Sequence, residues 1–108
     1  MPSPDEVLVV YSTFPSPDKA AEVARVLVEE QLVACVNIIP TVRSIYRWQA
    51  NVQDDSESLA ILKTSRDRFP DLARRLVQLH PYELPEVIAL PLAAGHPPYL
   101  AWVVGSVG

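Results

Sequence analysis

Val7-Leu8-Val9-Val10-Tyr11 is the stretch that decides the fold, because it is apolar on both faces and too short for a helix. A run of this kind is typical of a central strand that is covered on both sides. We expect helices of the same chain to cover one side. The other side is covered by the same chain or by a neighbouring copy, and the remaining elements decide which.

Helical spacing of apolar residues, together with capping residues and prolines, predicts three helices. Ser16 can cap the first helix, and the proline that follows it fits the first helical position. Pro81 ends the second helix, because the residue before a proline avoids helical geometry. The predicted helices cover residues 17–31, the segment from a cap at Ser65 or Asp67 to His80, and Tyr99 to Val104.

Alternation of apolar and polar residues predicts three further strands. The first of them starts near Ala34 and continues to Trp48, with a bulge or an edge position at Pro40, which lacks a hydrogen-bond donor. Gln49 to Asp55 is then a polar connection in a hairpin. The other two strands are expected at Glu57 to Thr64 and at Val87 to Leu92.

The predicted order of elements is β-α-β-β-α-β, followed by a short C-terminal helix. Two right-handed β-α-β units joined by a hairpin give an α+β, ferredoxin-like fold, a four-stranded antiparallel sheet with both helices on one face. The other face stays open within one chain. We therefore expect it to be buried by further copies of the chain.

Composition narrows the function classes. With 108 residues the chain is predicted to be one domain, 1–108. Nine Lys and Arg residues in a chain of net charge −4 argue against nucleic acid as a partner. No apolar run is long enough for a membrane span, and the start lacks the pattern of a signal peptide, so we expect a cytoplasmic protein without a membrane partner. The single cysteine, Cys35, fits a reducing compartment and reads as a small buried hydrophobe or an accessible thiol.

No catalytic signature is present. The chain has three glycines and therefore no glycine-rich phosphate loop, and it has no Cys-x-x-Cys, His-Glu-x-x-His or nucleophile-elbow motif. We therefore expect a protein that is not an enzyme.

Five stretches in order resemble the CutA family, the divalent-cation tolerance proteins. They are residues 32–40 (LVACVNIIP), 44–48 (SIYRW), 61–64 (ILKT), 80–86 (HPYELPE) and 99–102 (YLAW). The resemblance implies a homotrimer and a link to tolerance of copper and other divalent metals. Two departures from the family pattern stand out: Ala50 replaces a usual glycine, and Ser12 stands where some metal-associated members have a cysteine.

His80 and Glu86 form the candidate metal site, with Glu83 as a third donor. Imidazole and carboxylate are acceptable ligands for Cu²⁺, and the turn between the two residues can bring them together. The alternative is that His80 caps the second helix, where the helix dipole favours a charged ring. We expect no required cofactor, because this set is too small for a tight site, and at most weak binding of Cu²⁺ or another divalent cation.

Lys63 is the centre of a second hypothesis, because a lysine inside a sheet needs an acid partner, water or an anionic ligand. Aromatic residues could frame such a site between subunits, or they could simply pack the contact. These aromatic residues are Tyr46, Trp48, Tyr82 and Trp102. The hypothesis predicts a PII-like signalling or scaffold module that binds a small anion or a partner protein. The competing function is metal tolerance through weak metal binding.

Overall fold

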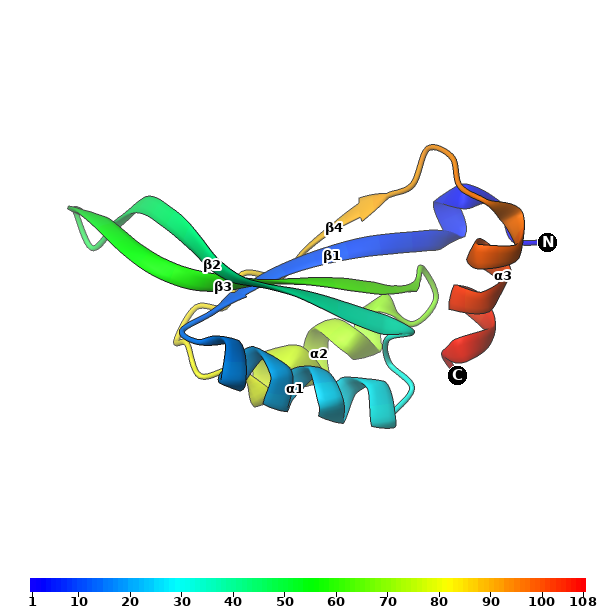
Figure 1. The fold of residues 1–108 in the computed structure, drawn as a ribbon, viewed down its shortest axis with the longest axis horizontal. Coiled ribbons are helices and arrows are strands. Elements are labelled where there is room, and N and C mark those ends of the chain that lie inside the picture. The colour runs from blue at the N-terminus through cyan, green and yellow to red at the C-terminus, as the bar shows by residue number, and fades with distance from the viewer.

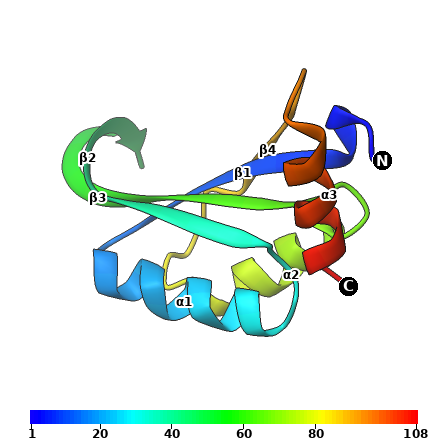
Figure 2. The same cartoon turned by 45° about the vertical axis from the view of Figure 1, so that its right-hand side comes forward.

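The computed structural model describes all 108 residues, Met1 to Gly108. A short 3₁₀ turn at Pro4–Glu6 is followed by β1 (Val7–Phe14), α1 (Pro17–Glu29), β2 (Cys35–Trp48), β3 (Asn51–Ser65), α2 (Phe69–Leu79), β4 (Ile88–Pro91) and α3 (Pro97–Ser106). Figures 1 and 2 show α1 and α2 on the same side of the sheet, while α3 lies at the end of the sheet near the N-terminus. No helix has both the length and the apolar character that crossing a membrane requires.

β1 is the central strand of the sheet, as the apolar run predicts. The strand order is β2-β3-β1-β4, and every neighbouring pair is antiparallel. Val7 lies opposite Ser65 of β3, and Leu8 lies opposite Pro91 of β4. The predicted α+β fold, with a four-stranded antiparallel sheet and helices on one face, is confirmed.

The core lies between the sheet and the two long helices. Val10 and Phe14 of β1 face this layer and are fully buried, as are Leu27 of α1 and Leu76 of α2. Each such side chain contributes about 1.5–3 kcal/mol by leaving water. β1 runs three residues further than the predicted end at Tyr11, which brings Phe14 into the core.

The opposite sheet face is not covered within the chain. Val9 and Tyr11 of β1 point to this face and are half-buried, and their partners across β4, Leu90 and Ile88, are exposed. Ile39 of β2 is also exposed. The open face expected from the apolar first strand is therefore present.

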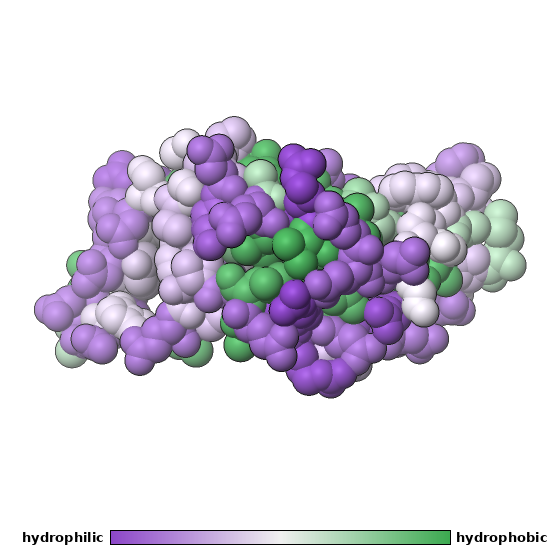
Figure 3. All heavy atoms as spheres, turned by 90° about the horizontal axis from the view of Figure 1, so that it is seen from below, coloured by the Kyte–Doolittle hydropathy of each residue, from purple (hydrophilic) through white to green (hydrophobic).

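The helix-bearing face is mostly hydrophilic, with one apolar patch near its centre (Figure 3). Val28 of α1 and Val77 of α2 are the exposed large apolar residues on these two helices. The pair Glu30 and Arg75 links the same helices through two hydrogen bonds of 2.8 Å.

Helix α1 ends two residues before the predicted position. Ser16 caps its start by accepting a hydrogen bond from the Lys19 N–H at 3.1 Å, as expected. At the other end Gln31 has a positive φ of 59°, and the Leu32 N–H donates to the Leu27 carbonyl. This backbone pattern is a Schellman motif, in which a residue with positive φ ends the helix.

The connection predicted at Gln49 to Asp55 is wrong. β2 runs to Trp48 and β3 begins at Asn51, so only Gln49 and Ala50 form the turn, both with positive φ. Residues 42–57 form a two-stranded ribbon, here called the arm, which projects beyond the rest of the sheet (Figure 1). The arm starts at a register shift between Ile39 and Val42, which confirms the bulge expected at Pro40.

The other predicted bounds need smaller corrections. β4 is shorter than predicted and spans Ile88–Pro91, while α3 is longer and spans Pro97–Ser106. Ser65 stands at the start of α2, where its hydroxyl accepts a hydrogen bond from the Arg68 N–H at 3.1 Å, but the helix itself begins at Phe69.

Candidate functional site

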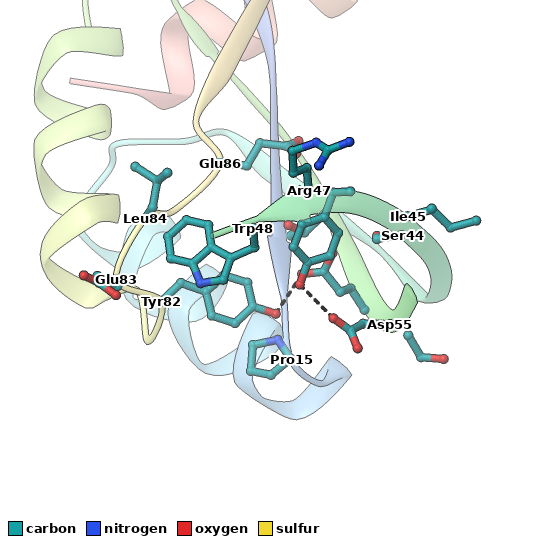
Figure 4. A pocket seen from close by; sticks show the side chains of 14 residues that line it. Pro15, Ser44, Ile45, Arg47, Trp48, Asp55, Tyr82, Glu83, Leu84 and Glu86 are labelled. Carbon is teal, nitrogen blue, oxygen red and sulfur yellow. Dashed lines mark hydrogen bonds between the residues drawn. The ribbon is translucent and has the colours of Figure 1, made fainter. Parts of the chain in front are cut away.

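A cavity of about 900 Å³ lies where the arm leaves the body of the sheet. Its walls come from the end of β1, from both strands of the arm, and from the segment that follows α2, and we call it the arm cleft. Figure 4 shows side chains from these elements around the cavity. The residues that line it are Thr13, Pro15, Ser44, Ile45, Tyr46, Arg47, Trp48, Asp55, Ser56, Glu57, Tyr82, Glu83, Leu84 and Glu86.

Two tyrosine–carboxylate pairs lie in the arm cleft. The Tyr46 hydroxyl donates to Asp55 Oδ2 at 2.7 Å, and the Tyr82 hydroxyl donates to Glu57 Oε2 at 2.8 Å. Asp55 and Glu57 are two residues apart on β3, so both side chains leave the strand on one face. Each phenol is therefore held by a carboxylate of the arm.

These pairs change the acidity of both phenols. The hydrogen bond to Asp55 is the main cause that raises the pKa of Tyr46. Burial raises the pKa of Tyr82 first, and the hydrogen bond to Glu57 raises it further. Both hydroxyls therefore stay protonated at neutral pH and act as donors to the carboxylates.

The arm cleft carries a negative charge. Four carboxylates line it, against the single guanidinium of Arg47. Two of them, Asp55 and Glu57, belong to the tyrosine pairs, and the other two, Glu83 and Glu86, come from the segment after α2. Such a charge distribution favours cations over anions.

His80 lies behind the arm cleft and is buried, with 8% of its surface exposed. Its ring stacks on Phe14 with 4.4 Å between ring centroids. The Nε2–H donates to the Thr13 carbonyl at 2.8 Å, and Nδ1 accepts the Tyr82 N–H at 3.1 Å. Burial lowers the pKa of His80, so the ring is neutral at pH 7.

The predicted metal ligands are not brought together as one set. Both ring nitrogens of His80 are used within the chain. Glu83 and Glu86 line the arm cleft, but Figure 4 shows the Glu83 carboxylate pointing away from the other side chains, whereas Glu86 extends toward Arg47. No group of three or more His, Cys, Asp or Glu residues is arranged to hold a metal ion. The suggested charged cap is also absent, because the residue ends α2 through its backbone N–H to Leu76 with a neutral ring.

The predicted aromatic and lysine set divides into two places within one chain. Tyr46, Trp48 and Tyr82 line the arm cleft. Lys63 lies elsewhere, where its ammonium donates to the amide oxygen of Asn37 at 2.7 Å and lies 6.0 Å from the Tyr99 ring. Its partner inside the chain is thus a neutral amide, not an acid.

Trp102 and Cys35 lie near Lys63, away from the arm cleft. The Trp102 ring is tilted against Tyr99, with 5.6 Å between centroids. Cys35 lies directly opposite Lys63 on the neighbouring strand and is half-buried, with Sγ 3.7 Å from the Tyr99 hydroxyl. It is therefore more exposed than a core cysteine.

Asp55, Glu57 and Thr13 are site residues that the sequence reasoning did not identify. The sequence predicts a loop at Asp55 and the start of a strand at Glu57, so it does not predict that the two side chains share a face. Alternation of acidic residues along a strand was the available signal, since it places their carboxylates on one face.

Comparisons with known proteins agree on one family. Residues 8–106 match the model of the CutA1 divalent ion tolerance protein. The chain is 49% identical over 100 residues to the divalent-cation tolerance protein CutA of Thermus thermophilus, covering 93% of this chain and 97% of that protein. It is 46% identical over 100 residues to Protein CutA of Mus musculus, where it spans 56% of the longer protein and 93% of its own length. The solved structure of the Thermus thermophilus protein superimposes with a TM-score of 0.91 at 48% identity, covering 94% of this chain and 99% of that one.

Proposed function

Because this chain belongs to the CutA1 divalent ion tolerance family, we propose that it acts in tolerance of divalent metal ions, copper among them, and not as an enzyme. The acidic arm cleft is the observation that carries this proposal. Four carboxylates against one arginine attract cations and repel anions. The family takes its name from tolerance and not from a reaction, which fits the lack of a catalytic motif.

Metal binding in this proposal is weak and takes place at the carboxylates of the arm cleft. Glu83 and Glu86 supply oxygen donors, and Asp55 and Glu57 add charge. Since no three donors converge, a bound ion keeps several of its waters. We expect affinity for Cu²⁺ that is roughly micromolar or weaker, because oxygen donors alone suit copper less well than nitrogen or sulfur.

His80 takes a supporting part in this proposal. Its Nδ1 holds the Tyr82 N–H and thereby fixes the start of the segment that carries Glu83 and Glu86. Nδ1 can bind a metal ion only when its hydrogen bond with the Tyr82 N–H is broken.

We propose further that the protein is a cytoplasmic homotrimer. The open sheet face supports this, because Leu90, Ile88 and Ile39 are exposed there and need a cover. The strand order is that of the ferredoxin-like arrangement, whose helix-free face is available for such packing. Light scattering at micromolar concentration should give three times the chain mass, and a stable monomer would contradict the assembly.

Calorimetry with Cu²⁺ at pH 7.5 tests the metal proposal. We expect the double variant Glu83→Gln and Glu86→Gln to bind Cu²⁺ clearly more weakly than the wild type. Glu29→Gln is the matched control, because it removes a charge from the exposed surface of α1. Equal loss in the control, or no loss in the double variant, would overturn the carboxylate site. His80→Ala should weaken binding no more than the double variant does, because His80 only positions these carboxylates; a larger loss with an intact fold would return His80 to the ligand set.

The alternative of a PII-like module that binds a small anion has weaker support. The arm cleft has the wrong sign of charge for an anion. Lys63 lies outside it and is hydrogen-bonded to Asn37.

A further inference from the structure

We propose that His80 is the sensor of a pH switch: when its ring takes up a proton, the segment that follows α2, residues 81–87, is released from the body of the fold. The switch goes beyond the proposed function, because it requires no metal ion. The hydrogen bonds of the His80 ring, its burial, and the way the chain holds the segment carry this inference.

The His80 ring is held on the helix-bearing side of the sheet. It stacks on Phe14, which belongs to the core between the sheet and the two long helices. Its Nε2–H donates to the Thr13 carbonyl at 2.8 Å, and its Nδ1 accepts the Tyr82 N–H at 3.1 Å. These contacts lie within one chain and do not depend on what covers the open face.

Protonation of this ring breaks one defined contact. The Thr13 carbonyl can only accept and the Tyr82 N–H can only donate, so the neutral ring carries its hydrogen on Nε2. A proton taken from solvent must therefore add to Nδ1. The new Nδ1–H and the Tyr82 N–H are then both donors, and the hydrogen bond between them is lost. The contact with the Thr13 carbonyl is kept, because Nε2 remains a donor.

Tyr82 is the residue through which the chain holds the segment. Residues 81–87 form neither helix nor strand, and their backbone groups make no backbone hydrogen bond within the chain. The two hydrogen bonds that the segment does make both belong to Tyr82. One is the N–H to His80, and the other is the hydroxyl to Glu57 Oε2 at 2.8 Å, on the side of the arm (Figure 4). Loss of the first removes the attachment next to the end of α2.

The surroundings of the ring favour release over a charged ring in place. Burial holds the pKa of His80 below its usual 6.5, while the Thr13 carbonyl and the charge of Glu57 act in the opposite direction. Tyr82 is the other titratable group in contact, and Phe14 of β1 carries no charge. In the released segment the ring is in water and regains its usual pKa. Release therefore becomes more favourable as the pH falls below about 6.5.

Amide hydrogen exchange of the assembled protein, followed by NMR at pH 7.5 and 5.5 and corrected for the intrinsic exchange rate, tests the switch. The Tyr82 amide should open more often at pH 5.5, by up to about tenfold, because a ring in water is about nine-tenths protonated there. The Val10 amide, in the buried part of β1, reports opening of the whole fold. It should be far more protected than the Tyr82 amide at both pH values.

Three variants identify the group that responds. His80→Asn has no titration in this range and keeps an oxygen that can accept the Tyr82 N–H, so its exchange should not change with pH. His96→Gln is the matched control, because His96 is exposed in the loop before α3, and it should keep the full response. Glu57→Gln should also keep a response. The ring-nitrogen chemical shifts of the wild type report protonation of His80 directly, so the test does not depend on a variant that folds.

Three results would overturn the inference. They are unchanged opening of Tyr82 between the two pH values, a response that persists in His80→Asn, and equal protection of Tyr82 and Val10. The first would mean that the segment is held by other contacts, and the last that the whole fold opens. The metal proposal is tested separately, because the Cu²⁺ calorimetry at pH 7.5 is done with His80 neutral. Failure of either proposal therefore leaves the other standing.

Discussion

Replacing His80 with phenylalanine is expected to lower the free energy of unfolding by about 2–4 kcal/mol. Phenylalanine fills nearly the same space and keeps the stacking on Phe14. The variant leaves the Thr13 carbonyl and the Tyr82 N–H without the hydrogen bonds that the imidazole makes at 2.8 and 3.1 Å. A buried polar group without a partner costs about 1–3 kcal/mol. Two such groups cost about 2–6 kcal/mol. A phenyl ring is easier to bury than an imidazole, which offsets part of this cost and brings the expected loss to about 2–4 kcal/mol.

Urea denaturation followed by circular dichroism measures this change. Wild type and variant must be compared at one protein concentration, because dissociation of an oligomer makes apparent stability depend on concentration. His96→Phe is the matched control, since His96 is exposed in the loop before α3 and makes no side-chain cap. The control should change the free energy by less than about 0.5 kcal/mol. A loss below 1 kcal/mol in His80→Phe would refute the view that both ring nitrogens are structurally engaged.

Burial lowers the pKa of His80 below its usual 6.5, so the folded protein binds a proton there less readily than the unfolded chain. Stability from this residue should therefore be complete above about pH 6.5 and be lost as the pH falls through the lowered pKa, and His80→Phe should lack this slope in denaturant titrations. Ala50→Gly should raise the free energy of unfolding by about 0.5–1 kcal/mol, because Ala50 has φ of 68° and the gain from glycine there exceeds the entropy it loses; a lower melting temperature would contradict this. Ser12→Ala should leave stability unchanged or raise it by about 1 kcal/mol, since the Ser12 hydroxyl is buried without a partner. In contrast, Thr64→Val should lower the free energy of unfolding by about 1 kcal/mol, because the Thr64 hydroxyl donates to the Leu32 carbonyl at 2.7 Å. Equal changes in Ser12→Ala and Thr64→Val would show that the partner of a buried hydroxyl does not affect stability here.

The body of the fold was predictable because its signals are local and agree with one another. Val7 to Tyr11 could only be a covered strand, and Ser16 marked the start of α1 correctly. The arm was missed for a physical reason. None of its residues from 42 to 57 is buried, so burial does not impose apolar alternation on it. Its turn, Gln49-Ala50, also lacks the Asn-Gly or Asp-Gly pair that usually marks such hairpins.

The candidate site was predictable only in part. Tyr46, Trp48 and Tyr82 line one cavity of a single chain, whereas Lys63 and Trp102, which the sequence placed with them in a site between subunits, do not line it. The predicted metal site required an accessible His80. The ring is buried because Phe14, far away in the sequence, and Tyr82 pack against it, and this packing is apparent only in the structure. The alternation of Asp55 and Glu57 indicates a shared face only if both residues lie on a strand, and the sequence predicted a loop at Asp55.

The position of β1 has a consequence for the order in which the chain folds. β1 is synthesised first, yet its partners across the sheet are Ser65 to Ser58 on one side and Pro91 to Ile88 on the other. Every one of its pairings closes a long loop, and loop closure of this kind slows folding. The hairpin of β2 and β3, by contrast, joins neighbouring residues around a two-residue turn. We therefore expect the hairpin to form early in refolding, and the central strand to enter the sheet late, after β3 and β4 are available to pair with it.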